Sequence, residues 1–85
     1  MTPHEYWTKL VQEFCLSGEL VLRGMKLDSI HEVVFDKDIR VLNINDNKIG
    51  FIPEEIGRLQ SLKALYVNQN YLDKLPYSLA ALSNL

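Results

Sequence analysis

Apolar residues recur at a fixed spacing from residue 39 to residue 84 of this chain. When segment 39–61 is placed above segment 62–84, every apolar anchor, both asparagines and both prolines fall in register at an offset of 23. A fixed period of this length is typical of repeat proteins, in which each unit buries its apolar face against its neighbours. We therefore expect two well-formed repeats, and Leu85 occupies the first anchor position of an incomplete one.

A less regular copy precedes these two repeats, in segment 17–38. Its first apolar residues, Leu20 and Leu22, alternate with other residues as in a short strand, and further anchors follow at the repeat spacing. Met25 stands where the later copies have asparagine, and His31 stands where they have proline. We interpret this segment as a degenerate first repeat, because the terminal units of such arrays are commonly atypical.

The first sixteen residues have the pattern of an amphipathic helix. Thr2, Pro3 and Glu5 form a helix-start signal, in which the third residue after the cap closes a capping box. One apolar stripe follows at helical spacing, and Cys15 widens it; its members are Trp7, Leu10, Val11 and Phe14. We expect a helix over 1–16 that covers the core of the first repeat, although it could instead present Trp7 to a partner.

Each regular repeat divides into a strand, an asparagine turn and an irregular or short helical return. The strands are expected at 41–44 and 64–67. The full pattern, Leu-x-x-Leu-x-Leu-x-x-Asn-x-Leu-x-x-Leu-Pro-x-x-Leu-x-x-Leu, resembles the leucine-rich repeat family, and most closely the 23-residue intracellular class of Ras-suppressor-like and Scribble-like proteins. This resemblance covers roughly residues 17–85. It implies an α/β fold: a short right-handed solenoid whose three-stranded parallel sheet lines a concave face, with the N-terminal helix as its cap.

Asn47 and Asn70 occupy the position where each chain segment turns away from its strand. A buried amide without hydrogen bonds would cost about 1–3 kcal/mol, so we expect both side chains to bond to backbone groups of adjacent repeats. They are predicted to form a structural ladder. This ladder should begin at Asn47, because Met25 cannot take part in it.

The concave face is the candidate functional surface. Strand alternation turns the residues between the core leucines outward, where a rigid tyrosine and adaptable amides suit protein binding. The candidate protein-binding residues are Arg23, Asn43, Asn45, Asp46, Tyr66, Asn68 and Gln69. The alternative interpretation is a solvated sheet face whose polar residues only maintain solubility.

Composition removes several other classes of function. The net charge is −2 with both signs mixed along the chain, so neither nucleic acid nor a membrane surface is expected as a partner. Cys15 is the single cysteine, and the first residues have no secretory pattern, which together predict a cytoplasmic protein. The spacing Asn43-x-Asn45-x-Asn47 is similar to a calcium loop, but Lys48 replaces the required glycine. We expect no metal, no cofactor and no catalytic activity.

The last repeat has no predicted cap, which leaves one apolar flank and one strand edge uncovered. Two explanations follow: a longer repeat protein of which this is a part, or a homodimer through residues 62–85. The favoured function is a protein–protein interaction module. The alternatives are an N-terminal regulatory or targeting part of a longer leucine-rich repeat enzyme or signalling protein, which the resemblance permits, and a self-associating fragment without a dedicated partner.

Overall fold

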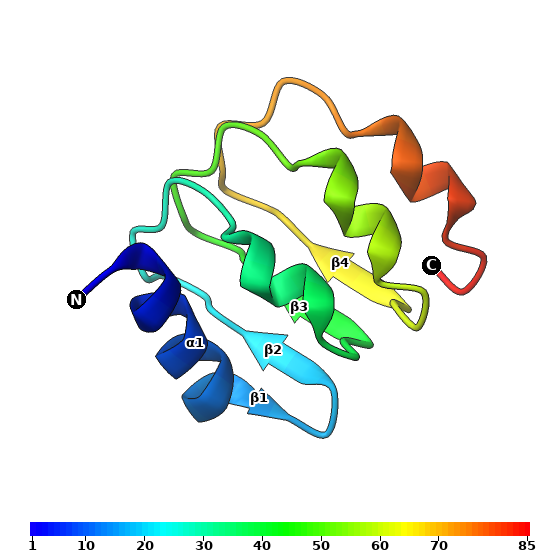
Figure 1. Ribbon diagram of the computed structural model, residues 1–85. Helices are drawn as coiled ribbons and strands as arrows, with labels where there is room; N and C mark the ends of the chain where they lie inside the picture. The colour runs from blue at the N-terminus through cyan, green and yellow to red at the C-terminus, as the bar shows by residue number, and fades with distance from the viewer.

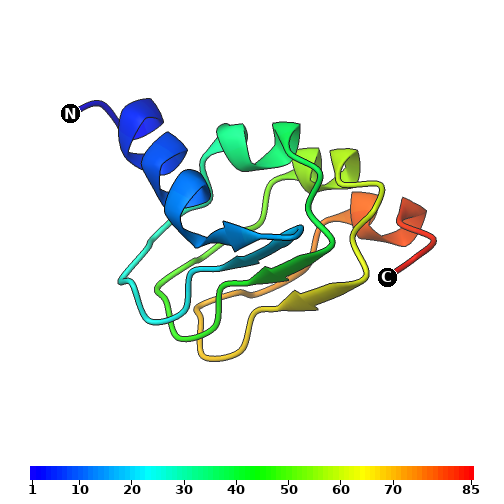
Figure 2. The same cartoon turned by 90° about the horizontal axis from the view of Figure 1, so that it is seen from below.

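The computed structural model describes all 85 residues of the chain. Its elements follow in the order α1 (Pro3–Phe14), β1 (Cys15–Leu16), β2 (Glu19–Val21), η1 (Glu32–Asp36), β3 (Val41–Asn43), η2 (Glu54–Arg58), β4 (Ala64–Tyr66) and η3 (Tyr77–Ala81). The η elements are single short 3-10 helices, one in each repeat. Figures 1 and 2 show the strands side by side along one side of the molecule and the η helices along the other. None of the helices has the length and apolar character needed to cross a membrane.

The sheet contains four strands in the order β1-β2-β3-β4. Strands β2, β3 and β4 are parallel and in repeat register, so that Leu20, Leu42 and Leu65 lie beside one another. The predicted parallel strands are therefore present, although β3 and β4 each end one residue earlier than expected. The prediction of a three-stranded parallel sheet is nevertheless wrong, because β1 pairs with β2 in the antiparallel direction and makes the sheet mixed.

The additional strand has a local cause in the turn between β1 and β2. Ser17 and Gly18 both have positive φ, at 54° and 81°. Two consecutive residues of this kind form the tight turns that match the twist of antiparallel strands. The chain therefore reverses immediately, and Cys15 and Leu16 pair with Leu20 and Glu19 instead of continuing the helix.

The helix start agrees with the sequence pattern, whereas the helix end does not. Thr2 and Glu5 form the predicted capping box. Helix α1 ends at Phe14, so the predicted boundary at residue 16 is wrong. Phe14 is also 38% exposed, although the apolar stripe placed it toward the core. Cys15 belongs to β1 and is partly buried.

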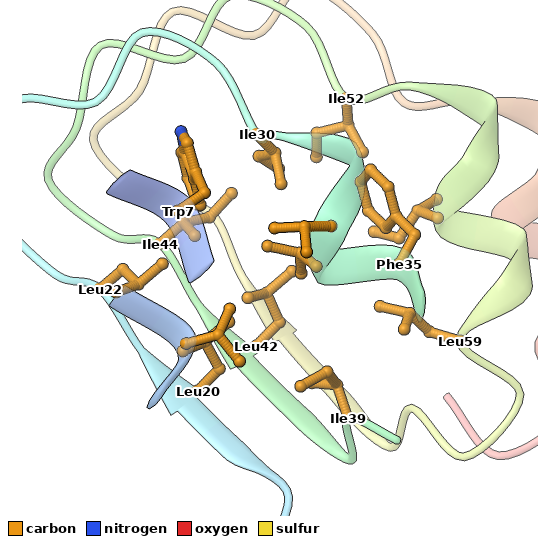
Figure 3. Close-up of a cluster of buried hydrophobic side chains, with 14 of the residues drawn as sticks. Trp7, Leu20, Leu22, Ile30, Phe35, Ile39, Leu42, Ile44, Ile52 and Leu59 are labelled. Carbon is orange, nitrogen blue, oxygen red and sulfur yellow. The ribbon is translucent and has the colours of Figure 1, made fainter. Parts of the chain in front are cut away.

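One apolar core joins α1, the strands and the η helices. Figure 3 shows Trp7 of α1 and Phe35 of η1 lying against leucines and isoleucines from the strands and loops. The first and second repeats supply most of this core, and Leu20, Leu42 and Ile56 are completely buried. Burying each such side chain stabilises the fold by about 1.5–3 kcal/mol, so the repeats depend on one another and on α1.

Candidate protein-binding face

The face of the sheet that points away from the η helices is the candidate site, and we call it the sheet face. Leu20, Leu42 and Leu65 point into the core from the middle of β2, β3 and β4. Successive side chains of a strand point to opposite sides, so the residues flanking these leucines project onto the sheet face. The strand register aligns these residues in two rows; they are Glu19, Val41 and Ala64, and then Val21, Asn43 and Tyr66.

Apolar side chains share the strand portion of the sheet face with Glu19 and Asn43. Leu16 is 79% exposed, Val21 is 44% exposed and Tyr66 is 46% exposed. Leu16 lies directly opposite Glu19 across the β1–β2 pair, and opposite residues of a pair share one face of the sheet. With the partly exposed Val41, these side chains give the face an apolar part, of which only Tyr66 was among the predicted binding residues. Sequence reasoning left out Leu16 because it placed this residue in the helix.

Polar side chains lie just after the strands, at the carboxyl ends of β2, β3 and β4. Arg23 Nε donates to Asp46 Oδ2 at 2.8 Å, so these two candidates form an ion pair between the first and second repeats. The two side chains are exposed, at 66% and 39%, and an exposed pair of this kind contributes about 0–1 kcal/mol. The pair therefore positions charge on the face more than it stabilises the fold.

The backbone turns at an equivalent place in all three repeats. Gly24, Asp46 and Gln69 have φ values of 68°, 60° and 58°, in the left-handed region. This conformation favours glycine, and asparagine or aspartate tolerates it better than most residues. In each repeat, the sheet face thus ends at an equivalent position, where the backbone has the left-handed conformation.

The candidate amides divide into fixed and free side chains. Asn43 Oδ1 accepts a hydrogen bond from the Asn45 backbone N–H at 3.0 Å, and Asn45 Oδ1 accepts one from the Asn68 backbone N–H at 2.6 Å. These two side chains are held in place by the protein. The side chains of Asn68 and Gln69 make no hydrogen bond within the chain. A partner could therefore approach Asn68 and Gln69 without breaking internal bonds, while Asn43 and Asn45 offer it their amide nitrogens and one remaining acceptor site on each Oδ1.

The two ladder asparagines lie behind this face and bond to the backbone. Asn47 is 6% exposed, and its Oδ1 accepts from the N–H groups of Met25 and Leu27 at 3.0 Å. Its Nδ2 donates to the carbonyls of Leu22 and Ile44 at 2.9 Å. Met25 thus enters the ladder through its backbone N–H and not through its side chain.

Asn70 makes similar bonds one repeat later, but its Oδ1 accepts from one backbone N–H and not from two. Its Oδ1 accepts from the Ile49 N–H at 3.0 Å, and its Nδ2 donates to the carbonyl of Ile44 at 2.9 Å and to that of Val67 at 3.2 Å. Both side chains therefore tie one repeat to the preceding one. All seven candidate binding residues, in contrast, lie on the strands or in the turns that directly follow them. No group of three or more histidine, cysteine, aspartate and glutamate side chains is arranged to hold a metal ion.

Comparison with known proteins agrees with this geometry. The sequence profile of the family described as leucine rich repeat matches residues 19–72. Over 70 residues, 79% of this chain, the sequence is 36% identical to the human volume-regulated anion channel subunit LRRC8E, of which the match covers 9%. Over 70 residues, 80% of this chain, it is 37% identical to plant intracellular Ras-group-related LRR protein 7 of Oryza sativa subsp. japonica, of which the match covers 27%. Rat LRRC8A, another subunit of that channel, is 33% identical over 64 residues, which are 72% of this chain and 8% of the subunit.

No solved structure matches the chain significantly. The chain spans about a quarter or less of the length of these curated relatives. The profile match covers more than half of the chain and includes the strands β2, β3 and β4 and the ladder asparagines. The chain therefore belongs to the leucine-rich repeat family.

Proposed function

We propose that this chain is a non-enzymatic protein–protein interaction module that binds a partner protein on the sheet face. The observation that supports this proposal is the exposure of Leu16, Val21 and Tyr66 on one face, next to a polar border formed by the turns after the strands. Protein interfaces typically combine an apolar centre with a polar rim. Leucine-rich repeats in general mediate protein–protein interaction, which agrees with this arrangement.

Tyr66 is the proposed anchor of the interaction. It is the most C-terminal apolar residue of the face and is 46% exposed, so a partner can still bury about half of its surface. Tyrosine is enriched among residues whose truncation costs at least about 2 kcal/mol of binding energy. The free amides of Asn68 and Gln69 would then bond to the partner at the rim, and the Arg23–Asp46 pair would fix its orientation.

A second candidate function follows from the relative lengths. The match covers 8% to 27% of the curated relatives, which are larger proteins. The chain could thus act as an N-terminal regulatory or targeting part of a longer leucine-rich repeat protein, with the repeats continuing as a right-handed solenoid. A cytoplasmic location is part of the proposal, and it is supported by the presence of a single cysteine.

The test is affinity capture with the intact chain and with two variants that differ in the face they alter. Tyr66→Ala combined with Val21→Ala removes apolar surface from the sheet face. Tyr77→Ala combined with Phe51→Ala removes exposed apolar surface elsewhere, because these residues are 92% and 68% exposed and lie outside the strands.

The proposal expects the first variant to lose the proteins that the intact chain captures, and the second variant to keep them. Far-ultraviolet circular dichroism of both variants controls for folding. If the sheet-face variant retains every partner while the control variant loses them, the proposed site is wrong.

A further inference from the structure

A cavity of about 500 Å³ lies between the start of α1 and the loop that follows β2. Figure 1 shows these two segments close to each other at the N-terminal end of the array. The volume falls within the range of about 300–1,000 Å³ that is usual for ligand sites. The apolar lining includes Trp7, Met25 and Leu27, and the polar lining includes Lys26 and Asp28. None of the lining residues is among the seven candidates on the sheet face, so the cavity is a separate surface.

Trp7 contributes an unpaired hydrogen-bond donor to this cavity. The residue is only 5% exposed, and its indole N–H has no acceptor within the chain. Since every fully buried side-chain nitrogen and oxygen does have a partner, this N–H must reach the molecular surface. Trp7 lines the cavity, and Figure 3 shows its nitrogen on the side of the ring that is turned away from Leu20 and Leu42. Indole can only donate, so the cavity favours a ligand that carries an acceptor.

The charged side chains of the cavity balance each other. Lys26 and Asp28 both lie on the loop, both are exposed, and neither takes part in an ion pair of the chain. A carboxylate ligand would be attracted by Lys26 but repelled by Asp28, and the reverse holds for a cation. The Asp28 carboxylate accepts hydrogen bonds and cannot donate them. The lining therefore matches an uncharged ligand with an acceptor for Trp7 and a donor for Asp28.

The loop wall of the cavity has a shape that is particular to the first repeat. Lys26 has a φ of 58°, in the left-handed region, whereas the equivalent residues of the later repeats, Lys48 and Tyr71, do not have a positive φ. Met25, which stands in place of the ladder asparagines, is partly buried against the core. A methionine side chain is flexible and polarisable, so it can adapt to an apolar group placed beside it. The degenerate repeat thus offers a surface that the regular repeats do not have.

We propose that this cavity binds an extended, uncharged peptide segment of a partner protein, through one apolar side chain and the backbone amide next to it. A peptide group supplies one acceptor and one donor, which are the groups that Trp7 and Asp28 require. The apolar side chain packs against the Trp7 ring and Leu27. Tyr6 and Lys26 on the rim are exposed, so the cavity is open on one side and the segment can continue beyond it.

The first test is titration of the intact, isotope-labelled chain with the capped peptide acetyl-Ala-Leu-Ala-amide, followed by nuclear magnetic resonance. Trp7 is the only tryptophan, so its indole N–H gives a single signal. This signal should shift and saturate with a dissociation constant of about 0.1–10 mM. Acetyl-Ala-Gly-Ala-amide should bind roughly tenfold more weakly, because it lacks the apolar side chain.

Three results would overturn the proposal. Absence of a saturable shift with either peptide would mean that the cavity is not a peptide site. Equal affinity for the two peptides would remove the role of the apolar side chain. Tighter binding of acetyl-Ala-Leu-Ala with a free carboxylate would show that the site prefers an anionic ligand to an uncharged segment.

The second test locates the site with matched variants. Ser29→Phe places a large side chain on the wall of the cavity and should abolish the shift, whereas Ser83→Phe, at an exposed serine outside the cavity, should preserve it. The sheet-face variant, Tyr66→Ala with Val21→Ala, should also preserve it, so this inference and the proposed function can fail separately. The backbone amide signals show whether each variant is folded. Unchanged peptide binding by a folded Ser29→Phe variant would overturn the cavity as the binding site.

Discussion

The Glu54 carboxylate of the second repeat accepts a hydrogen bond from the backbone N–H of Tyr77 in the third repeat, at 2.9 Å. The same carboxylate accepts from the Ser78 N–H at 3.1 Å, and the Ser78 hydroxyl donates back to the Glu54 carbonyl at 2.7 Å. Glu54 therefore caps η3, whose own N-cap residue, Pro76, makes no side-chain cap. The cap gives the last repeat a polar attachment to the array, in addition to its apolar contacts.

Replacing Glu54 with glutamine should loosen η3. Glutamine keeps one acceptor oxygen but loses the charge, and loss of a helix cap costs about 0.5–2 kcal/mol. Hydrogen exchange at the Tyr77 and Ser78 amides should accelerate, with a smaller effect on the strands. Glu55→Gln, at the neighbouring exposed glutamate that makes no such bond, should leave these amides unchanged. Equal acceleration in both variants would show that Glu54 has no capping role.

Gly57→Ala should destabilise the contact between η2 and η3. A Cβ on Gly57 would lie 2.8 Å from Ser78 Cβ, which is closer than folded proteins allow. Because Ser78 is fixed to Glu54, the clash should cost about 1–3 kcal/mol in urea unfolding. Gly50→Ala is the control, since nothing lies within 4 Å of a Cβ there.

Adding Ser78→Gly tests the cause of that loss. This change removes the clashing Cβ, so the double variant should be more stable than the sum of the two single losses implies. Residues in contact commonly show coupling of about 0.5–3 kcal/mol in such a cycle. Additive losses would mean that the effect of Gly57→Ala does not arise at Ser78.

Asn47→Ala should cost more stability than Asn70→Ala. Asn47 is buried at 6% exposure and bonds to the N–H groups of both Met25 and Leu27, whereas Asn70 is partly exposed and bonds to one such group. Each buried group left without a partner costs about 1–3 kcal/mol. Urea unfolding should show the larger loss of unfolding free energy for Asn47→Ala. A larger loss for Asn70→Ala would contradict the conclusion that the more buried asparagine contributes more to stability.

The turn between β1 and β2 can be tested at its glycine. Gly18 has a φ of 81°, and a Cβ there would lie 3.1 Å from Arg40 Cγ, so Gly18→Ala adds a contact to the backbone strain. Gly24→Ala, at a φ of 68° with no atom near the added Cβ, adds strain alone. A left-handed backbone costs about 1–2 kcal/mol for a residue other than glycine. Thermal unfolding should therefore show that Gly18→Ala is the more damaging change.

The repeat could be read from the sequence because its constraints are local and periodic. Leu20, Leu42 and Leu65 have equivalent strand positions, and the structure pairs them side by side. The position of Asn47 in the turn indicated a bonded amide, because a buried amide cannot remain without partners. These inferences need only the spacing of residue types.

Other features depended on competition between local structures. The apolar stripe extended to Phe14 and Cys15, so it favoured a longer helix than the one that forms. The residues that indicate a hairpin are Ser17 and Gly18. Their two-residue turn forms in place of a further turn of the helix. As a consequence Leu16 became part of the sheet face.

The capping role of Glu54 could not be predicted from the sequence, for a different reason. In the sequence it is a charged residue on the outside of the array, and a solvated role is the natural expectation. Its actual partners are backbone groups 23 and 24 residues away, which become neighbours only through the stacking of η2 on η3. Such contacts follow from tertiary structure and leave no sign in the local pattern.

The most direct test of binding on the sheet face is site-specific photo-cross-linking at two tyrosines. A benzophenone side chain at position 66 replaces an aromatic residue on the sheet face, and the same side chain at position 77 replaces one on η3. Tyr77 is 92% exposed and Tyr66 is 46% exposed, so accessibility alone would favour position 77. The account predicts that a partner protein cross-links to position 66 and not to position 77. Cross-linking of that partner to position 77 alone would contradict it.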